Sequence, residues 1–206
     1  MDTEERRAAG MRRRRGPSKK LDAAIAAATL RLLAESGPSG VSIDAVARAV
    51  GCSRSSIYRR HATKESLILD AALSGFGSQT VPEDGSLLEW VTRSRAASFG
   101  EPAFVVALTV LMDEALRGTE LGRRYLEEVF GPIRLERAGF LARAMANGEI
   151  RDDTDVDLIL DIVTGSLLFR AAHHPEREDD LPKRLAAVLL YGVGARRVAE
   201  PPDDAG

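Results

Sequence analysis

The spacing of apolar residues is the feature that most limits how this chain can fold. Four apolar residues near the N-terminus follow one another at intervals of four, three and four, which places them on one face of a helix. They are Leu21, Ile25, Ala28 and Leu32. Similar stripes recur in most later segments, and no alternating strand pattern of useful length interrupts them. We therefore predict an all-α protein.

Composition bounds the kind of protein. A chain of 206 residues with 44% hydrophobic residues can bury a sizeable core, as one compact unit or as a small domain with a larger companion. Its single cysteine, Cys52, excludes an internal disulfide framework and suits a reducing cytosol. The uncharged run at 23–30 is short for an export signal, and no run reaches the roughly 18 apolar residues of a membrane span. We expect a cytoplasmic protein with no membrane partner.

The charges of the chain are unevenly distributed. Residues 1–74 carry 14 Lys and Arg against 8 Asp and Glu, whereas residues 75–206 carry 15 against 23. A basic first third followed by an acidic remainder is typical of a protein that meets a polyanion at one end. Chance segregation of solvated charges is the alternative explanation. The run Arg12–Arg15 fits a DNA-binding arm and a solvated tail equally well.

Breaks in the helical pattern divide the chain. The segment SGPSG at 36–40 ends the first helix, and GFGSQTVPEDGS at 75–86 separates the first four predicted helices from the rest. Later helices are predicted at 87–99, 102–116, 121–145, 155–172 and 181–192. The third of these is expected to kink at Gly131-Pro132, because proline removes a helical hydrogen bond.

The segment SIDAVARAVGCSRSSIYRRHATKESL, residues 42–67, has the spacing of a helix-turn-helix. Ala47 is small where two helices cross, Gly51 permits a positive φ in the turn, and Ile57 is buried between helices. Ser42 and Ser53 are suited to cap the two helices. The N-terminal turn of the second helix is then free to enter the major groove of DNA.

The polar residues around this helix are the candidate DNA contacts. Arg54, Ser55 and Ser56 point outward in the first turn, where an arginine can pair with guanine. The residues that follow are placed for phosphates, and Lys64 lies near a helix N-terminus that also attracts anions. The alternative is an ordinary helical hairpin with solvated basic residues. The full candidate set is Ser42, Ser53, Arg54, Ser55, Ser56, Tyr58, Arg59, Arg60, His61 and Lys64.

The stretch VSIDAVARAVGCSRSSIYRRHATKESLILDAAL resembles the N-terminal domain of the TetR (tetracycline-repressor) family of bacterial transcriptional regulators. The resemblance covers residues 18 to about 75, and it departs at His61, where relatives often carry tryptophan or phenylalanine. By this resemblance the recognition helix spans 53–60, residues 54–56 face bases, and Tyr58, Arg59 and Lys64 hold the DNA backbone. It implies a homodimer on a palindromic operator, released by an unidentified small-molecule effector.

The resemblance also implies an organisation for the whole chain. We predict a disordered basic arm at 1–17, a helix-turn-helix domain at 18–75 with its motif at about 41–60, a helical effector-binding and dimerisation domain at 76–195 and a disordered tail at 196–206. The segment RAMANGEIRDDTDVDLILDIVTGSLLFRAA resembles a loop and helix of one large TetR subgroup. By that resemblance the last two helices pair with their copies through Ile159, Ile162, Val163, Ser166, Phe169, Leu181, Leu185, Val188 and Leu189. The alternative is that these residues fill a monomer core.

The middle helices enclose an effector pocket by the same resemblance. The residues that could line it are Trp90, Phe99, Phe104, Leu108, Met112, Tyr125 and Phe130. Apolar residues at helical spacing also form plain core, which is the alternative for each of them.

We find no motif for catalysis, a cofactor or a metal. The chain lacks a nucleophile elbow, a Walker loop and a zinc-protease motif, the GVGARR segment follows no strand, and His173 and His174 diverge on a helix. We predict a non-enzymatic, sequence-specific transcriptional regulator, most simply a repressor. The alternatives are a nonspecific DNA-organising protein and a helical small-molecule-binding protein or enzyme with an incidental basic face.

Overall fold

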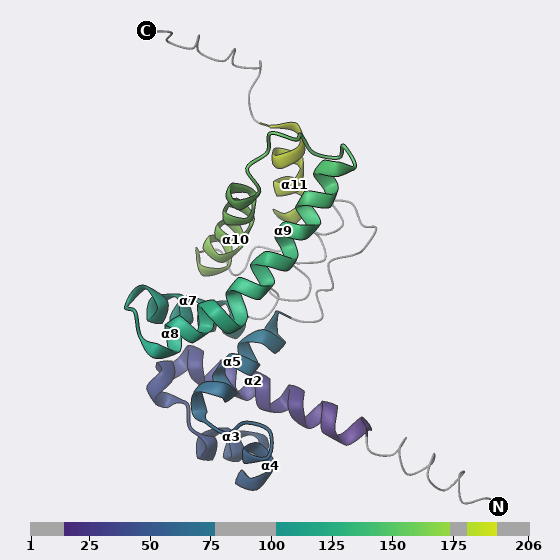
Figure 1. The fold of residues 1–206 in the computed structure, drawn as a ribbon. Coiled ribbons are helices and arrows are strands. Elements are labelled where there is room, and N and C mark those ends of the chain that lie inside the picture. Colours follow the sequence, from purple (N-terminus) through teal and green to yellow (C-terminus); the bar gives the residue numbers. More distant parts are fainter. Residues whose placement is uncertain (1–14, 77–101, 174–180, 193–206) are drawn as a thin grey trace, which may run out of the picture.

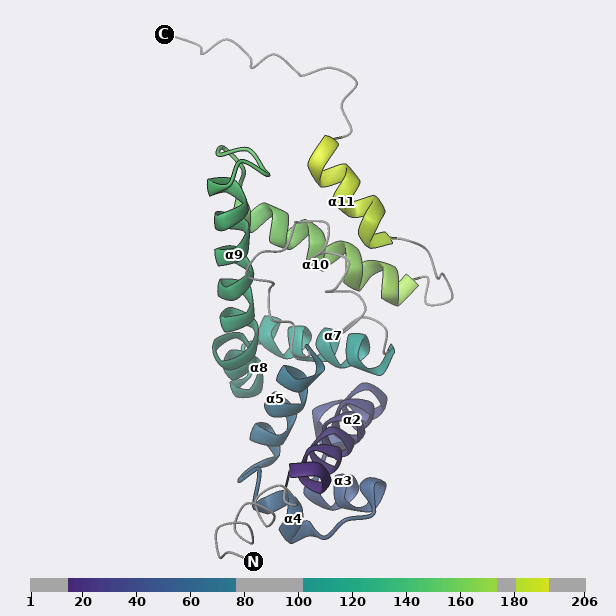
Figure 2. The ribbon, with the colours of Figure 1, turned by 90° about the vertical axis from the view of Figure 1, so that its right-hand side faces the viewer.

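The computed structural model describes residues 15–76, 102–173 and 181–192 of the chain. Every regular element within these ranges is a helix, which confirms the predicted all-α class. The molecule is elongated, with α3 and α4 at one end and α11 at the other (Figures 1 and 2). The predicted arm, the tail and the helix at 87–99 fall wholly or largely outside the described residues.

Four helices build the N-terminal part: α2 (Arg15–Gly40), α3 (Ile43–Val50), α4 (Arg54–Tyr58) and α5 (Lys64–Gly75). The first of them begins at Arg15, a few residues earlier than the sequence predicted. Its regular backbone breaks at Gly37, which has φ of 63° immediately before Pro38. Only glycine adopts this conformation without strain, so the predicted stop in SGPSG has a local cause.

The C-terminal part contains α7 (Pro102–Leu116), α8 (Glu120–Tyr125), the π-helical turn η1 (Leu126–Phe130), α9 (Gly131–Ala146), α10 (Val156–His173) and α11 (Leu181–Tyr191). The kink expected at Gly131-Pro132 takes the form of η1. Pro132 has no N–H, and the Gly131 N–H bonds to the carbonyl of Leu126, five residues back. Helix α9 thus continues from α8 through one widened turn.

The larger hydrophobic core does not stop at the end of α5. It joins buried residues of α2–α5 to residues of α7, α8 and η1. Phe76, which follows α5, meets Phe104 of α7 edge to face, with ring centroids 5.2 Å apart. The C-terminal part is therefore anchored directly on the N-terminal helices.

A smaller core lies at the opposite end, between α9, α10 and α11, around Leu141, Leu160 and Ala186. Arg134 of α9 ties this unit together, because it donates hydrogen bonds of 2.7 Å to both Asp157 and Asp161 of α10. These two carboxylates raise the pKa of the Arg134 guanidinium. The pairing fixes α10 along α9.

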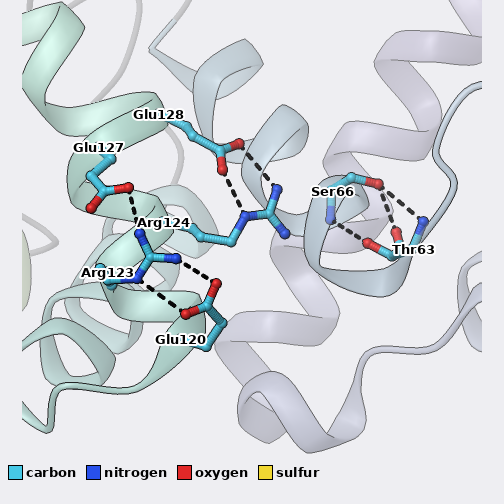
Figure 3. Close-up of polar contacts among 7 residues, drawn as sticks. All are labelled: Thr63, Ser66, Glu120, Arg123, Arg124, Glu127 and Glu128. Carbon is cyan, nitrogen blue, oxygen red and sulfur yellow. Dashed lines mark hydrogen bonds and ion pairs between the residues drawn. The ribbon is translucent and has the colours of Figure 1, made fainter.

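Polar contacts secure the helix ends near the junction of the two parts (Figure 3). Thr63 caps α5 reciprocally with Ser66, whose backbone N–H and hydroxyl both take part. On α8, Arg123 bonds to Glu120 and Glu127, and Arg124 bonds to Glu128 across η1. The Arg123 hydrogen bond lowers the pKa of Glu120. The pairs of Arg123 with Glu127 and of Arg124 with Glu128 join α8 to the widened turn.

Candidate nucleic-acid interface

The turn between α3 and α4 has the geometry that the sequence predicted. Gly51 lies in the left-handed region with φ of 72°, and its N–H bonds to the carbonyl of Ala47. Ala47 and Ile57 are both buried, and Ile57 is fully excluded from solvent. The Ser42 hydroxyl caps α3 by accepting the Ala45 N–H at 3.1 Å. The two helices therefore cross on small and apolar side chains, and their polar faces point away from the core.

Three serines organise the N-terminus of α4. The Ser53 hydroxyl accepts the Ser56 N–H at 3.3 Å and lies 2.9 Å from the hydroxyls of both Ser55 and Ser56. Ser53 and Ser55 are exposed, whereas Ser56 is half-buried. The cap leaves the first turn of α4 exposed on the outside of the domain.

Arg54 projects from this first turn. Its side chain is 68% exposed and forms an ion pair with Asp44 of α3, which is itself 46% exposed. An exposed ion pair is weak, because water screens both partners. The guanidinium of Arg54 therefore remains accessible to another partner.

Tyr58, Arg59 and Lys64 surround the C-terminal end of α4. Tyr58 is 57% exposed, although it is a large aromatic residue beside a buried one. Arg59 is also exposed, and Lys64 is half-buried and donates to the Pro38 carbonyl at 3.3 Å. Tyr58 and Arg59 lie on the solvent side, while Lys64 reaches back to the turn that ends α2.

Arg60 and His61 are arranged differently from the sequence prediction that they face phosphates. Their side chains are only 18% and 15% exposed. Arg60 pairs with Asp22 of α2 at 2.5 Å, and His61 Nδ1 lies 2.8 Å from Asp70 of α5. Both side chains thus turn toward the body of the domain.

Three acidic residues of this region were missed by sequence reasoning: Asp22, Asp44 and Asp70. Each is the partner of a basic residue in or next to α4. Asp22 precedes Arg60 by 38 residues, so no local pattern links them. The other two pairs, Asp44 with Arg54 and His61 with Asp70, are much closer in the sequence.

The residues predicted to line an effector pocket divide into two groups. Trp90 and Phe99 lie outside the described residues. Phe104, Leu108 and Tyr125 are buried, and Met112 and Phe130 are half-buried. All five of the described residues belong to the larger core or pack against it.

The residues predicted for the dimer interface also divide. Val163 and Leu185 are buried within the chain, in the smaller core. Ile162, Phe169 and Val188 are exposed, at 37%, 63% and 46%. Two further exposed apolar residues, Leu158 and Tyr191, lie on the same two helices and were not predicted. The other predicted residues are half-buried: Ile159, Ser166, Leu181 and Leu189.

Residues 15–76, 102–173 and 181–192 hold no group of three or more His, Cys, Asp or Glu side chains placed to bind a metal ion. None of the helices in those ranges combines the length and the apolar character needed to cross a membrane.

A short helix with an exposed first turn, joined by a glycine turn to the helix before it and followed by a second helical domain, defines a helix-turn-helix DNA-binding regulator. The model of bacterial regulatory proteins of the tetR family matches residues 25–74, and that of the tetracyclin repressor-like C-terminal domain matches residues 82–189. The chain belongs to the TetR family of transcriptional regulators.

Similar proteins come from several bacteria. The HTH-type transcriptional regulator YdeS of Bacillus subtilis (strain 168) is 26% identical over 181 residues, which cover 86% of this chain and 91% of YdeS. The structure of the TetR family regulator SCO0332 has 26% identity and a TM-score of 0.60, over 85% of this chain and 99% of that one. FadR from Bacillus subtilis, in complex with stearoyl-CoA, has 17% identity and a TM-score of 0.63, over 83% and 98% of the two chains.

Proposed function

We propose that this regulator is a repressor that binds a palindromic operator in the cytoplasm as a homodimer and leaves it when an effector binds. The observation that carries the proposal is the exposed first turn of α4, where Arg54 and Ser55 stand clear of the core. Arginine reads guanine through O6 and N7. Tyr58 and Arg59 flank this turn on the solvent side and are suited to phosphates.

Symmetry supports the dimer. Two recognition helices must lie about 34–36 Å apart to enter successive major grooves of a palindromic site. A stripe on α10 offers the surface that would set this distance. Leu158, Ile162 and Phe169 are exposed along it, and a Cβ atom added to Gly165 between them would meet nothing within 4 Å. An exposed apolar stripe with a glycine at its centre suits close packing against its own copy.

The larger core supports control by an effector. Because the core runs from the DNA-binding helices into α7 and α8, a molecule that displaces α7 or α8 also strains α2 and α5. The Tyr125 side chain is 1% exposed and belongs to the larger core, so its hydroxyl lies among mainly apolar neighbours. An effector that carries a hydrogen-bond acceptor would satisfy that hydroxyl. FadR from Bacillus subtilis, which has a similar fold, binds stearoyl-CoA, a ligand with such groups, and this supports the proposal.

The proposal is tested by binding the purified protein to duplex DNA from its own upstream region and to a shuffled duplex, over a series of salt concentrations. We expect preference for the upstream fragment and an affinity that falls steeply as salt rises. Equal binding to both duplexes would instead favour the nonspecific DNA-organising alternative. The mass of the complex measures whether two chains bind one operator.

A further inference from the structure

The recognition helix is too short to be stable alone. Helix α4 spans five residues, Arg54–Tyr58, whereas isolated helices shorter than about 12–15 residues are marginal in water. Ser53 caps its N-terminus and the buried Ile57 anchors its middle. Its C-terminal end, from which the chain leaves toward α5, therefore needs its own support.

Arg60 supplies that support through two hydrogen bonds. Its Nη1 donates to the carbonyl of Ser56 at 2.7 Å, and its Nε donates to Asp22 Oδ1 at 2.5 Å. The Arg60 backbone N–H bonds to Ile57 instead of Ser56, so the side chain takes up a carbonyl that the short helix leaves open. One guanidinium thus joins the end of α4 to α2.

His61 makes a second connection, to α5. Its Nδ1 lies 2.8 Å from Asp70 Oδ2, and its backbone N–H donates to the Ile57 carbonyl at 2.9 Å. A groove of about 760 Å³ lies between α2 and α5 at this point, and Asp22, Asp70, Arg60 and His61 all border it. The two polar contacts lie along this groove, and each joins the end of α4 to one of its walls.

We propose that Asp22 and Asp70 are positioning residues for operator DNA, which hold α4 at the angle needed for base contacts. Arg60 and His61 then act inside the domain, and the phosphate contacts belong to the exposed residues around them. This inference rests on the proposed operator binding, and it assigns a role in that binding to two carboxylates.

The direction in which DNA affinity changes when a carboxylate is neutralised distinguishes a positioning residue from a bystander. A carboxylate beside DNA repels phosphates, so Asp22→Asn or Asp70→Asn would raise DNA affinity if the residue were a bystander. If the carboxylate positions α4, the same substitution lowers operator affinity. We expect a loss of roughly tenfold, equal to about 1.4 kcal/mol, with little change for shuffled DNA. Glu35→Gln is the matched control, because Glu35 is an exposed carboxylate of α2 whose ion pair within the described residues is a long one, with Arg31 at 3.9 Å.

A charge exchange tests the Arg60–Asp22 pair itself. Arg60→Asp and Asp22→Arg each reverse one charge, and the double variant restores both the pair and the net charge. We expect the double variant to regain part of the preference for operator over shuffled DNA that each single variant loses, because the exchange restores the ion pair but leaves no donor for the Ser56 carbonyl. A phosphate contact by Arg60 predicts instead no recovery, and a salt slope reduced by about one in Arg60→Asp.

Amide hydrogen exchange gives a readout that needs no DNA. The Arg60 and His61 N–H groups bond to the Ile57 carbonyl at 2.8 and 2.9 Å, and both should exchange faster in Asp22→Asn and Asp70→Asn. Unchanged exchange together with unchanged or raised operator affinity would overturn the positioning role. If the wild-type protein failed to prefer its operator while exchange still quickened, the proposed function would fail and the support of α4 would stand.

Discussion

Gly75, the last residue of α5, lies so close to Phe104 of α7 that a Cβ atom built on it would come within 2.4 Å of two ring carbons. Phe104 is buried and also meets Phe76. This contact joins the DNA-binding helices to the C-terminal part at a point where no side chain fits between them.

Replacing Gly75 by alanine should therefore destabilise the protein. We expect the free energy of unfolding to fall by about 1–3 kcal/mol, because the added methyl group overpacks a rigid aromatic contact. Urea denaturation measures the change. Gly139→Ala on α9 is the control, since its Cβ would come no nearer than 3.8 Å to Arg143 Nη1, and helix propensity favours alanine there. Equal effects at the two glycines would contradict the role of the Phe104 contact.

Arg54→Ala should lose both affinity and selectivity for the operator. We expect a cost of about 1–3 kcal/mol and a relaxed preference at one base pair, because a bidentate guanine contact disappears. Competition binding against operators with single base changes measures it. Equal losses on operator and random DNA would assign Arg54 to the phosphate backbone instead.

Phe169→Glu should separate the proposed homodimer. Phe169 is 63% exposed on α10, and a carboxylate buried against its copy would stay unpaired. We expect monomers in sedimentation velocity and weaker operator binding. Leu116→Glu is the control, because Leu116 is 86% exposed on α7, away from the proposed interface. An intact Phe169→Glu dimer would place the interface elsewhere.

Tyr125 should make stability depend on alkaline pH. Burial raises the pKa of Tyr125 above its usual value of about 10. The phenol therefore stays protonated in the folded protein while it ionises in the unfolded chain. Above a pH of about 10, the free energy of unfolding should fall by up to about 1.4 kcal/mol per pH unit from this group.

Tyr125→Phe tests this linkage, because phenylalanine keeps the packing and has no proton to lose. Chemical denaturation of both proteins between pH 8 and about 11 should show a decline in stability for the wild type that exceeds the decline for the variant. Parallel curves for the two proteins would mean that the Tyr125 hydroxyl reaches solvent or a polar partner.

The sequence was sufficient to predict the features that depend on residues close together in the chain. The spacing of apolar residues predicted the helical class. Ala47, Gly51 and Ile57 predicted the register of the helix-turn-helix, because the role of each residue is determined by the local backbone conformation. Serine caps and the stop at Gly37 follow the same rule.

The sequence was insufficient to predict side-chain contacts between residues that lie far apart in the chain. The prediction that Arg60 and His61 contact phosphates did not anticipate their carboxylate partners on α2 and α5, because the fold alone brings these residues together. Likewise Val163 and Leu185 carry the same apolar signal as Ile162 and Phe169. Only the packing of α10 and α11 on α9 distinguishes the buried pair from the exposed one.

The shared core has a consequence for engineering and for evolution. Domain shuffling works when two modules meet through a thin, polar junction. Here a recombinant that took residues up to Phe76 from this chain and the remainder from a relative would place a foreign α7 against Gly75, Phe76 and α2. Hybrids with new operator specificity should therefore be assembled by transplanting the solvent-facing residues of α4, or by moving α7 together with the N-terminal helices.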